Sequence, residues 1–422
     1  MMMRLASTHE VFNQSLRWSE RGRLANEYPT RFKAFDGKRH PRDVVEFDSA
    51  YPECMELRFG AAYAWGGLRF VRGSSRENRR ACVTSCRITV MGAGIVGLWQ
   101  AYTLAYRGHT VRLVERTATP FTNTASQFAG AMLSPYCERE GAHPLVQELG
   151  VRGAAIWRQI FPGVASMGSL VVALARDRVE LAQFATRTEG YEVLNAVELA
   201  LLEPELASRF QQGLFYRSEA HVEPTAAMAF LLNAIRRLGA EVLLGSSFAD
   251  TGNDIVIDCR GIAANSELKA LRGVRGERAV VQTGEVKFNR PIRLLHPRHR
   301  LYVVPWPMGT YMIGATMIES DDTGPVTLRS TLDLLGLAYS LHPAFGEARV
   351  LSLDAGVRPA FPDNLPRIIV DGKTIRINGL FRHGFLLAPV LAELVADYLD
   401  TGLRLPEVIA LEPMAVTAQE AS

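Results

Sequence analysis

The pattern of apolar and polar residues predicts alternating strands and helices over most of the chain. An apolar run at 88–91 is followed by a helical pattern that ends near Gly108, and a second apolar run covers 111–114. Short apolar runs are typical of buried strands, whereas apolar residues at helical spacing indicate a helix with one buried face. These segments therefore predict a strand–helix–strand unit with two parallel strands.

Later segments continue this alternation to about residue 399. Predicted helices lie near 144–160, 178–188, 196–205, 225–238 and 389–399, and Gly239 is suited to end the fourth. Predicted strands lie at 169–175, 241–244, 255–258, 368–370 and 375–378, and the block 276–316 is rich in short strand-like runs. Strand–helix units thus flank a β-rich middle, and the sequence has no internal repeat.

Three glycines join the first predicted strand to its helix. The loop reads Gly92-Ala93-Gly94-Ile95-Val96-Gly97, and Glu115 follows Gly97 by 18 residues, at the end of the second strand. Gly92 allows a tight turn, Gly94 lets the backbone approach a pyrophosphate, and Gly97 lets the helix pack on the strand. The helix N-terminus would bind the phosphates and Glu115 a ribose. The sequence therefore predicts a site for an adenine dinucleotide.

Two simpler interpretations compete with a dinucleotide site. One is an apolar helix with incidental glycines, and the other is a membrane span, because residues 88–106 carry no charge. The complete strand–turn–helix–strand context argues against the first. The three glycines and the strand that follows them argue against the second, so no membrane span is expected.

Composition and charge are those of an ordinary soluble globular protein. The net charge is +3, with 48% hydrophobic and 22% charged residues, which does not favour nucleic-acid binding. Five scattered cysteines, with no metal-ligand spacing beyond the pair Cys82 and Cys86, favour a reducing compartment. The first ten residues lack the apolar core of a secretory signal. We therefore expect a cytoplasmic protein.

Four more motifs lie in the second half of the chain. They are His221-Val222-Glu223-Pro224, Tyr302-Val303-Val304-Pro305 with Gly314-Ala315-Thr316-Met317, Ala355-Gly356-Val357-Arg358-Pro359, and Asn378-Gly379-Leu380-Phe381-Arg382-His383-Gly384-Phe385-Leu386-Leu387-Ala388-Pro389. In the last motif, a strand runs into a glycine-containing loop before an apolar helix, and Pro389 suits the first helical turn. Backbone N–H groups of residues 384–387 would favour a group that gains negative charge. A helix start without a ligand is the alternative.

Together with the glycine loop, these motifs resemble the FAD-dependent D-amino acid oxidase superfamily, and most closely the glycine oxidases of thiamine biosynthesis. The resemblance covers about residues 87–400. It implies non-covalent FAD, because no cysteine lies near the C-terminal loop. It also implies that glycine or another small amino acid is oxidised by hydride transfer from Cα to flavin N5. O2 would be the electron acceptor, giving H2O2, and the imine would be hydrolysed or handed to a thiazole synthase.

The resemblance also implies a fold class and a division into domains. The fold is α/β, with a discontinuous, Rossmann-like FAD-binding domain and an inserted β-rich α+β substrate domain. The FAD-binding domain would comprise 86–165, 222–275 and 353–422, and the substrate domain 166–221 and 276–352. A homo-oligomer is expected.

Cofactor contacts are implied for the residues that match the family motifs. Ile95, Val96, Glu115 and Arg116 would meet the adenosine half of FAD, and backbone atoms at Phe248 would hold the adenine. The segment 125–133 would lie against the pyrophosphate and the ring. The complete implied set is Gly92, Gly94, Ile95, Val96, Gly97, Glu115, Arg116, Ser126, Gly130, Met132, Leu133, Phe248, Gly261, Arg382, His383, Gly384, Phe385, Leu386 and Leu387.

Arg358 matches the family arginine that binds the substrate carboxylate. A guanidinium group can hold a carboxylate in two parallel hydrogen bonds, which would place the substrate Cα. Tyr302, Met317 and Arg382 match residues near the substrate. The alternatives are a structural ion pair for Arg358 and plain packing for Tyr302 and Met317.

Two segments depart from the family pattern, so the resemblance does not define the floor of the pocket beyond Arg358 or its entrance. Residues 360–364 replace a glycine-rich turn after Arg358, and residues 296–300 are unusually basic. A D-amino acid or N-methyl amino acid oxidase or dehydrogenase is therefore an alternative function. A dinucleotide-binding regulator without catalysis is another.

Residues 1–85 differ from the rest of the chain. They hold 15 Lys and Arg and 10 Asp and Glu, and their apolar residues follow neither helical nor strand spacing. We predict a poorly ordered or loosely attached extension. A small independent domain and an organellar transit peptide are the alternatives, although a transit peptide is normally poor in acidic residues.

Deletion of residues 1–82 tests this prediction. The truncated protein should keep its cofactor, because every predicted cofactor residue lies beyond the deletion. The measurement is the ratio of bound FAD to protein after purification, compared with the full chain. A truncated protein without FAD would show that the extension is required.

Overall fold

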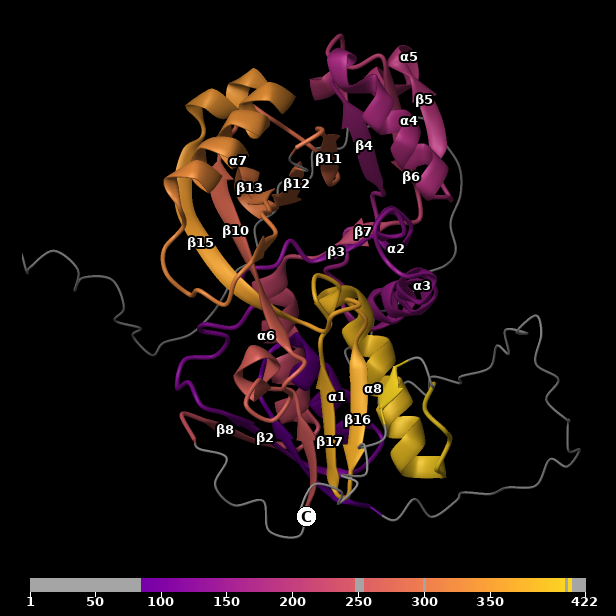
Figure 1. Cartoon of the computed structure of the whole chain (residues 1–422), viewed down its shortest axis with the longest axis vertical. Coiled ribbons are helices and arrows are strands. Elements are labelled where there is room, and N and C mark those ends of the chain that lie inside the picture. Colours follow the sequence, from indigo (N-terminus) through magenta and orange to yellow (C-terminus); the bar gives the residue numbers. More distant parts are fainter. Residues whose placement is uncertain (1–84, 247–253, 299–300, 407–408, 412–422) are drawn as a thin grey trace, which may run out of the picture. The chain divides into compact units, whose positions relative to one another are not determined.

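Two large β-sheets organise the part of the chain that the structure describes (Figure 1). The computed structural model describes residues 85–246, 254–298, 301–406 and 409–411. One sheet has seven strands and the other has nine, and a short two-stranded ladder joins β3 to β7. The predicted N-terminal extension lies outside the described residues, apart from Ser85.

The chain begins with a strand, a helix and a second strand, and later helices and strands follow in a less regular order. The strands are β1 Arg87–Met91, β2 Thr110–Glu115, β3 Met132–Leu133, β4 Ser169–Ala173, β5 Glu192–Asn195, β6 Gln212–Tyr216, β7 Ala220–His221, β8 Glu241–Leu244, β9 Ile255–Asp258, β10 Arg272–Gln282, β11 Ile292–Leu295, β12 Leu301–Trp306, β13 Thr310–Gly314, β14 Ile318–Glu319, β15 Arg349–Ala360, β16 Arg367–Asp371, β17 Thr374–Asn378 and β18 Ala410–Leu411. The α-helices are α1 Ile95–Tyr106, α2 Pro135–Glu138, α3 Pro144–Ile160, α4 Arg178–Arg187, α5 Ala196–Leu202, α6 Pro224–Arg237, α7 Leu328–Leu341 and α8 Gly384–Thr401.

The seven-stranded sheet has the order β18-β16-β17-β9-β1-β2-β8. Its strands β17, β9, β1, β2 and β8 are parallel to one another, and β16 is antiparallel to β17. The chain order reverses at β1, because β2 lies on one side of it and β9 on the other. Ligands of open parallel sheets bind at the carboxyl ends of the strands where such a reversal occurs. The Gly92–Gly97 loop follows β1 and therefore lies at this point.

Helices cover this sheet and supply the other half of its core. Helix α1 packs against α6 and α8, and α8 also packs against α3. The buried cluster between these helices and the sheet includes Val90, Leu98, Ile377 and Leu391, each no more than 1% exposed. Burial of such apolar side chains stabilises the fold and holds the first turns of α1 and α8 in place.

The nine-stranded sheet has the order β14-β10-β13-β12-β11-β4-β6-β5, with β15 also paired to β10. All its pairs are antiparallel except the parallel pair β4 and β11. The pair β10 and β15 is the longest, and Figure 1 shows these two strands running side by side. The α/β fold class is confirmed, and strands β10 to β13 occupy the block that the sequence predicts to be β-rich.

Strands β10 and β15 run through two of the predicted domain boundaries, at 275/276 and 352/353. The structure thus joins the two predicted domains through continuous strands. The assignment of a cofactor domain and a substrate domain to the predicted residue ranges stays a prediction.

The last helix is the clearest correction to the predicted elements. It begins at Gly384 rather than near residue 389, so Pro389 lies inside the helix. A proline inside a helix cannot donate to the carbonyl four residues earlier, here that of Phe385. The Nε1–H group of Trp157 donates to this carbonyl instead, at 2.6 Å. A tertiary hydrogen bond therefore satisfies the carbonyl that the proline leaves free.

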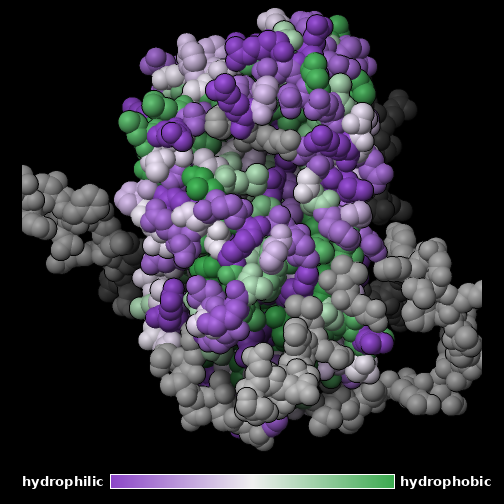
Figure 2. All heavy atoms as spheres, viewed as in Figure 1, coloured by the Kyte–Doolittle hydropathy of each residue, from purple (hydrophilic) through white to green (hydrophobic). Residues whose placement is uncertain are grey.

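The visible face of the described residues mixes polar and apolar side chains in small groups (Figure 2). Among the helices that the structure describes, none combines the length and the apolar character needed to cross a bilayer.

The replacement of Trp157 by Phe should destabilise the fold. The Phe385 carbonyl would be left buried without a donor, at a cost of about 1–3 kcal/mol. In a P389A background the new N–H group of residue 389 can bind this carbonyl, so W157F should cost less there. Denaturant unfolding of the unmodified protein, W157F, P389A and the double variant gives the four free energies of unfolding that measure this coupling. An equal cost in both backgrounds would contradict the explanation.

Candidate active site

The turn between β1 and α1 is shaped by close contacts of its glycines. Gly92 has φ +96°, and a Cβ atom on it would lie 2.8 Å from the carbonyl oxygen of Cys259. A Cβ on Gly97 would lie 1.8 Å from the carbonyl oxygen of Gly92. In contrast, a Cβ on Gly94 would contact only Ser126 Oγ, at 3.4 Å. Two glycines therefore serve packing, and the third borders open space that a pyrophosphate could use.

The polar groups around this turn hold it in place. The backbone N–H of Ile95 donates to Ser126 Oγ at 3.0 Å, and the N–H of Ala93 donates to Glu115 Oε2 at 2.8 Å. Thr117 donates to Glu115 Oε1 through its backbone N–H and its hydroxyl, at 3.1 and 3.2 Å. Since a carboxylate has about four acceptor positions, the buried Glu115 keeps one for a ribose. Arg116 is exposed beside it.

The first turn of α8 meets the first turn of α1. A Cβ on Gly384 would lie 3.5 Å from Cγ2 of Ile95, and Val96 lies half-buried next to it. The side chains of Phe385, Leu386 and Leu387 are buried in the core, so only their backbone groups remain for a cofactor. The first turns of α1 and α8 therefore lie side by side. The first N–H groups of a helix have no partner within the helix, so those that remain unbonded here could bind an anionic group.

The remaining predicted cofactor residues lie in several places. Met132 and Leu133 form β3, which pairs with His221 and Ala220 of β7. Gly130 lies against Tyr302, since a Cβ on it would be 3.0 Å from the tyrosine ring. The carbonyl oxygen of Gly261, which has φ +60°, accepts a hydrogen bond from Asn378 Nδ2 at 2.9 Å. Phe248 lies outside the described residues.

Two buried polar atoms at this place support a polar ligand. Ser134 Oγ, directly after β3, and His383 Nδ1, directly before α8, have no hydrogen-bond partner among the described residues. Buried polar atoms normally have a partner, and each flanks a segment predicted to lie against the ring. These atoms and the open space beside Gly94 fit a large polar cofactor such as FAD.

Arg358 lies near the end of β15, and its guanidinium group lies against Gly276 of β10. A Cβ on Gly276 would lie 2.0 Å from Nη2 of Arg358, so only a glycine leaves room for the guanidinium group. Nη1 donates to the carbonyl oxygen of Thr316 at 3.1 Å. Burial lowers the pKa of Arg358, and nearby Tyr302 partly offsets this effect. Among the described residues, no carboxylate forms an ion pair with Arg358, which argues against a purely structural ion pair.

Glu138, at the end of α2, is a site residue that sequence reasoning missed. Its oxygens lie 2.9 and 3.0 Å from Nε and Nη2 of Arg382, 2.9 Å from Nη2 of Arg293 and 3.0 Å from Nε2 of His383. Burial alone would raise the pKa of Glu138, but Arg382, His383 and Arg293 outweigh burial and hold this pKa well below its ordinary value. Glu138 is therefore ionised. The only sequence signal is an acidic residue shortly after the predicted cofactor segment.

The predicted substrate-side residues lie close to Arg358. Tyr302 is near enough to affect its pKa, and Met317 directly follows Thr316, whose carbonyl Arg358 binds. Met317 is 57% exposed, and its sulfur lies 3.7 Å from Nη1 of Arg382. The structure therefore brings the four predicted substrate-side residues together.

A family model for the cofactor chemistry matches most of the chain. The model described as DAO, FAD dependent oxidoreductase, matches residues 87–398. The chain belongs to the FAD dependent oxidoreductase family. A second model, described as the N-terminal domain of the adaptive response protein AidB, matches residues 6–95. The second match leaves both the extension and the small-domain interpretations of residues 1–85 open.

Two named relatives are similar to this chain over nearly their whole length, and a third over about half of its length. The Rhizobium etli protein named as a thiamine biosynthesis oxidoreductase, ThiO, is 51% identical over 323 residues, which is 76% of this chain and 98% of that protein. Glycine oxidase from Bacillus licheniformis is 28% identical, covering 73% of this chain and 91% of that protein. A bifunctional ThiO/ThiG protein from Trichormus variabilis is 25% identical over 74% of this chain and 52% of that protein.

A solved structure confirms the fold. The crystal structure of glycine oxidase from Bacillus cereus matches with a TM-score of 0.66 and 23% identity, covering 76% of this chain and 96% of that chain. The family match and these structural neighbours make the chain an FAD-dependent oxidoreductase with a Rossmann-like fold.

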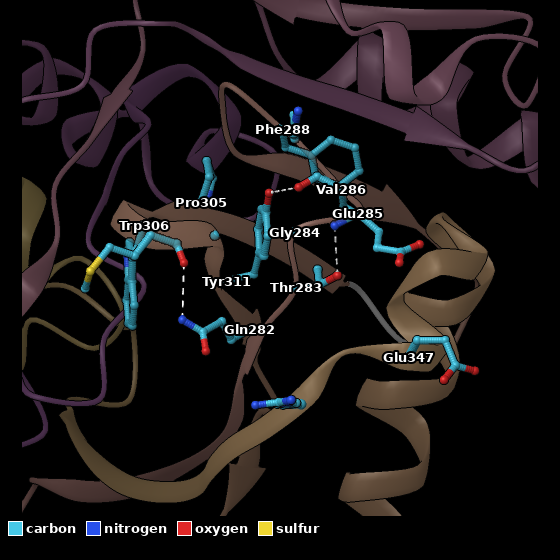
Figure 3. A pocket seen from close by; sticks show the side chains of 14 residues that line it. Gln282, Thr283, Gly284, Glu285, Val286, Phe288, Pro305, Trp306, Tyr311 and Glu347 are labelled. Atoms are coloured by element: carbon cyan, nitrogen blue, oxygen red, sulfur yellow. Dashed lines mark hydrogen bonds between the residues drawn. The ribbon is translucent and has the colours of Figure 1, made fainter. Parts of the chain in front are cut away.

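A pocket of about 630 Å³ lies elsewhere, next to the ends of β10, β12 and β13 (Figure 3). Its lining includes Gln282, Trp306 and Glu347, and the Tyr311 hydroxyl donates to the carbonyl of Val286 at its wall. None of the predicted site residues lines it. The predicted site residues lie instead around Arg358 and the first turns of α1 and α8, which form the candidate active site.

Substitutions at Gly94 and Gly97 should separate cofactor binding from folding. A G94V side chain enters open space in the fold, so the apoprotein should keep its stability while FAD content falls strongly. A G97A methyl group meets the Gly92 carbonyl, which should destabilise the apoprotein by about 1–3 kcal/mol. Bound FAD and apoprotein unfolding are measured in both variants. Full FAD content in G94V would exclude a ligand beside Gly94.

Proposed function

We propose that this enzyme oxidises glycine or another small amino acid and supplies the product to thiazole formation in thiamine biosynthesis. The observation that carries the proposal is Arg358, a guanidinium group without a carboxylate partner among the described residues, close to Arg382 in the loop before α8. The 51% identity to the Rhizobium etli ThiO over 98% of its length supports the same function.

In this proposal, Arg358 binds the carboxylate of the substrate in two hydrogen bonds. Tyr302 and Met317 border the same space, and Gly276 leaves room for the guanidinium group. A fixed carboxylate orients the Cα–H bond, and such positioning supplies much of the rate. When bound, FAD supplies the acceptor for the hydride from Cα.

No side-chain base is assigned. Glu138 is the nearest carboxylate in the described cluster, but its lowered pKa and its three cationic partners make it a poor proton acceptor. The substrate amine would therefore have to arrive unprotonated. Water then converts the imine to an oxo acid and ammonia, unless a thiazole synthase takes it first.

The electron acceptor and the partner belong to the same proposal. O2 would accept the two electrons and two protons, giving H2O2. The fusion of ThiO to ThiG in the Trichormus variabilis relative supports a hand-over to a thiazole synthase. A cytoplasmic homo-oligomer remains our expectation from the sequence.

A D-amino acid or sarcosine-type oxidase or dehydrogenase is the alternative. The 30% identity to D-amino-acid oxidase from Rubrobacter xylanophilus, over 66% of this chain, favours this option. The two functions share Arg358 and differ in the side chain or N-methyl group that the pocket admits. A panel of glycine, sarcosine, D-alanine and D-proline with peroxide detection distinguishes them.

Anaerobic reduction tests the proposed function. Purified protein should be yellow, and glycine should bleach its flavin absorbance without oxygen. Oxygen should then restore the colour with one H2O2 per glycine. A protein that binds FAD but stays oxidised with all four amino acids would refute amino acid oxidation.

Removal of the Arg358 side chain tests its role. R358A should keep FAD but lose about 2–5 kcal/mol of substrate binding, seen as a large fall in kcat/KM for glycine. G276A should have a similar effect, because its methyl group displaces the guanidinium group. R349A, an exposed arginine in the same strand, is the matched control and should behave like the unmodified enzyme. Unchanged turnover of R358A would remove its assigned role.

A further inference from the structure

Glu138 and Arg382 form a two-point ion pair at the edge of the candidate substrate site. Nε of Arg382 lies 2.9 Å from Glu138 Oε2, and Nη2 lies 3.0 Å from Oε1. This is the parallel geometry in which a guanidinium group binds a substrate carboxylate. The internal carboxylate of Glu138 thus already occupies that face of Arg382. The Glu138 side chain is only 10% exposed, so water competes poorly with the pair.

Three guanidinium groups, those of Arg278, Arg358 and Arg382, lie in this region, and two of them have an acidic partner. Asp354 Oδ2 lies 3.1 Å from both Nε and Nη2 of Arg278, whose pKa Tyr302 also affects. Glu138 pairs with Arg382 and is shared with Arg293. Arg358 binds only a carbonyl and lies beside a phenol. Of these three groups, Arg358 is the one that forms no ion pair with a carboxylate among the described residues.

Arg382 is close enough to Arg358 to affect a bound ligand. Thr316 accepts a hydrogen bond from Arg358, and the next residue, Met317, contacts Nη1 of Arg382. The charge of Arg382 also lowers the pKa of Arg358, as expected for near neighbours. A ligand held at Arg358 could thus extend a second acidic group toward Arg382.

We propose that Glu138 determines specificity: it occupies Arg382, so that the site binds amino acids with one carboxylate and rejects those with two. This proposal rests on the proposed amino acid oxidation. A second ligand carboxylate would meet a guanidinium face whose Nε and Nη2 already donate to Glu138, so it would be left without a cationic partner. A charged ligand group that loses its hydration and finds no partner is a common source of discrimination between ligands. Glu138 acts through Arg382 and is a positioning residue.

The first experiment compares malonate with malonamate on the FAD-loaded enzyme. Malonamate has the same shape but carries an amide in place of one carboxylate, and neither compound has an amine to oxidise. Binding is followed by the change in flavin absorbance, independently of turnover. The enzyme should bind malonamate at least about tenfold more tightly than malonate, which corresponds to 1.4 kcal/mol. Equal affinities would overturn the proposal.

The second experiment changes the ion pair. In E138Q the amide keeps the size of Glu138 but removes its charge, which frees Arg382. Malonate should then bind about as tightly as malonamate or more tightly. The ratio of kcat/KM for D-aspartate to kcat/KM for its isostere D-asparagine should rise. The double variant E138Q/R382Q should lose this gain. E192Q is the control, because it breaks a surface two-point pair with Arg217 and should leave the ratio unchanged. An E138Q protein that still prefers malonamate tenfold would refute the proposal.

The R382Q variant provides a further test if E138Q fails to fold or to hold FAD. In R382Q, Glu138 stays negative, so the preference for malonamate should remain at or above its original value, and a fall would refute the proposal. The proposed function fails separately, if neither glycine nor malonamate perturbs the bound flavin. Flavin perturbation by glycine and malonamate without discrimination against malonate would overturn only the specificity role of Glu138.

Discussion

The close approach of two helix N-termini constrains the whole candidate site. Helix α1 begins after β1 and helix α8 after β17, yet Gly384 lies against Ile95. The apolar core between these helices and the parallel sheet holds this arrangement. Free N–H groups of both first turns therefore share one place, at the point where the strand order reverses. A large anionic cofactor is the ligand that such an arrangement favours.

Charge balance is the second constraint on the site. Four buried or half-buried groups, Glu138, Arg293, Arg382 and His383, come from α2, β11 and the loop before α8. Isolated charges are costly to bury, so Glu138 and its three partners depend on one another. Arg358 stands apart, since its described partners are uncharged. The same protein region thus contains a closed ion-pair cluster and one cation that is free to bind an anion.

The sequence predicts the cofactor half of the fold well because its signals are local. The glycine loop, the apolar strands and Glu115 lie within about 30 residues, and strands at 241–244 and 255–258 have the predicted bounds. The start of the last helix was predicted wrongly, because a proline normally marks the first turn. Trp157, which is 228 residues away from Phe385, supplies the missing hydrogen bond and permits the longer helix. The residues next to Phe385 in the sequence do not predict such a contact.

The sequence by itself determined the α/β fold class, the FAD dependent oxidoreductase family and the residue types of the cofactor cradle. Those features depend on spacing within single strand–turn–helix units, where local geometry dictates the residue. Only the tertiary structure decided that Glu138 pairs with Arg382 and that Gly276 makes room for Arg358. Both facts follow from strand pairing and packing between segments far apart in the chain. Ion-pair partners and steric neighbours across such distances are set by the fold as a whole, which leaves no periodic pattern in the sequence.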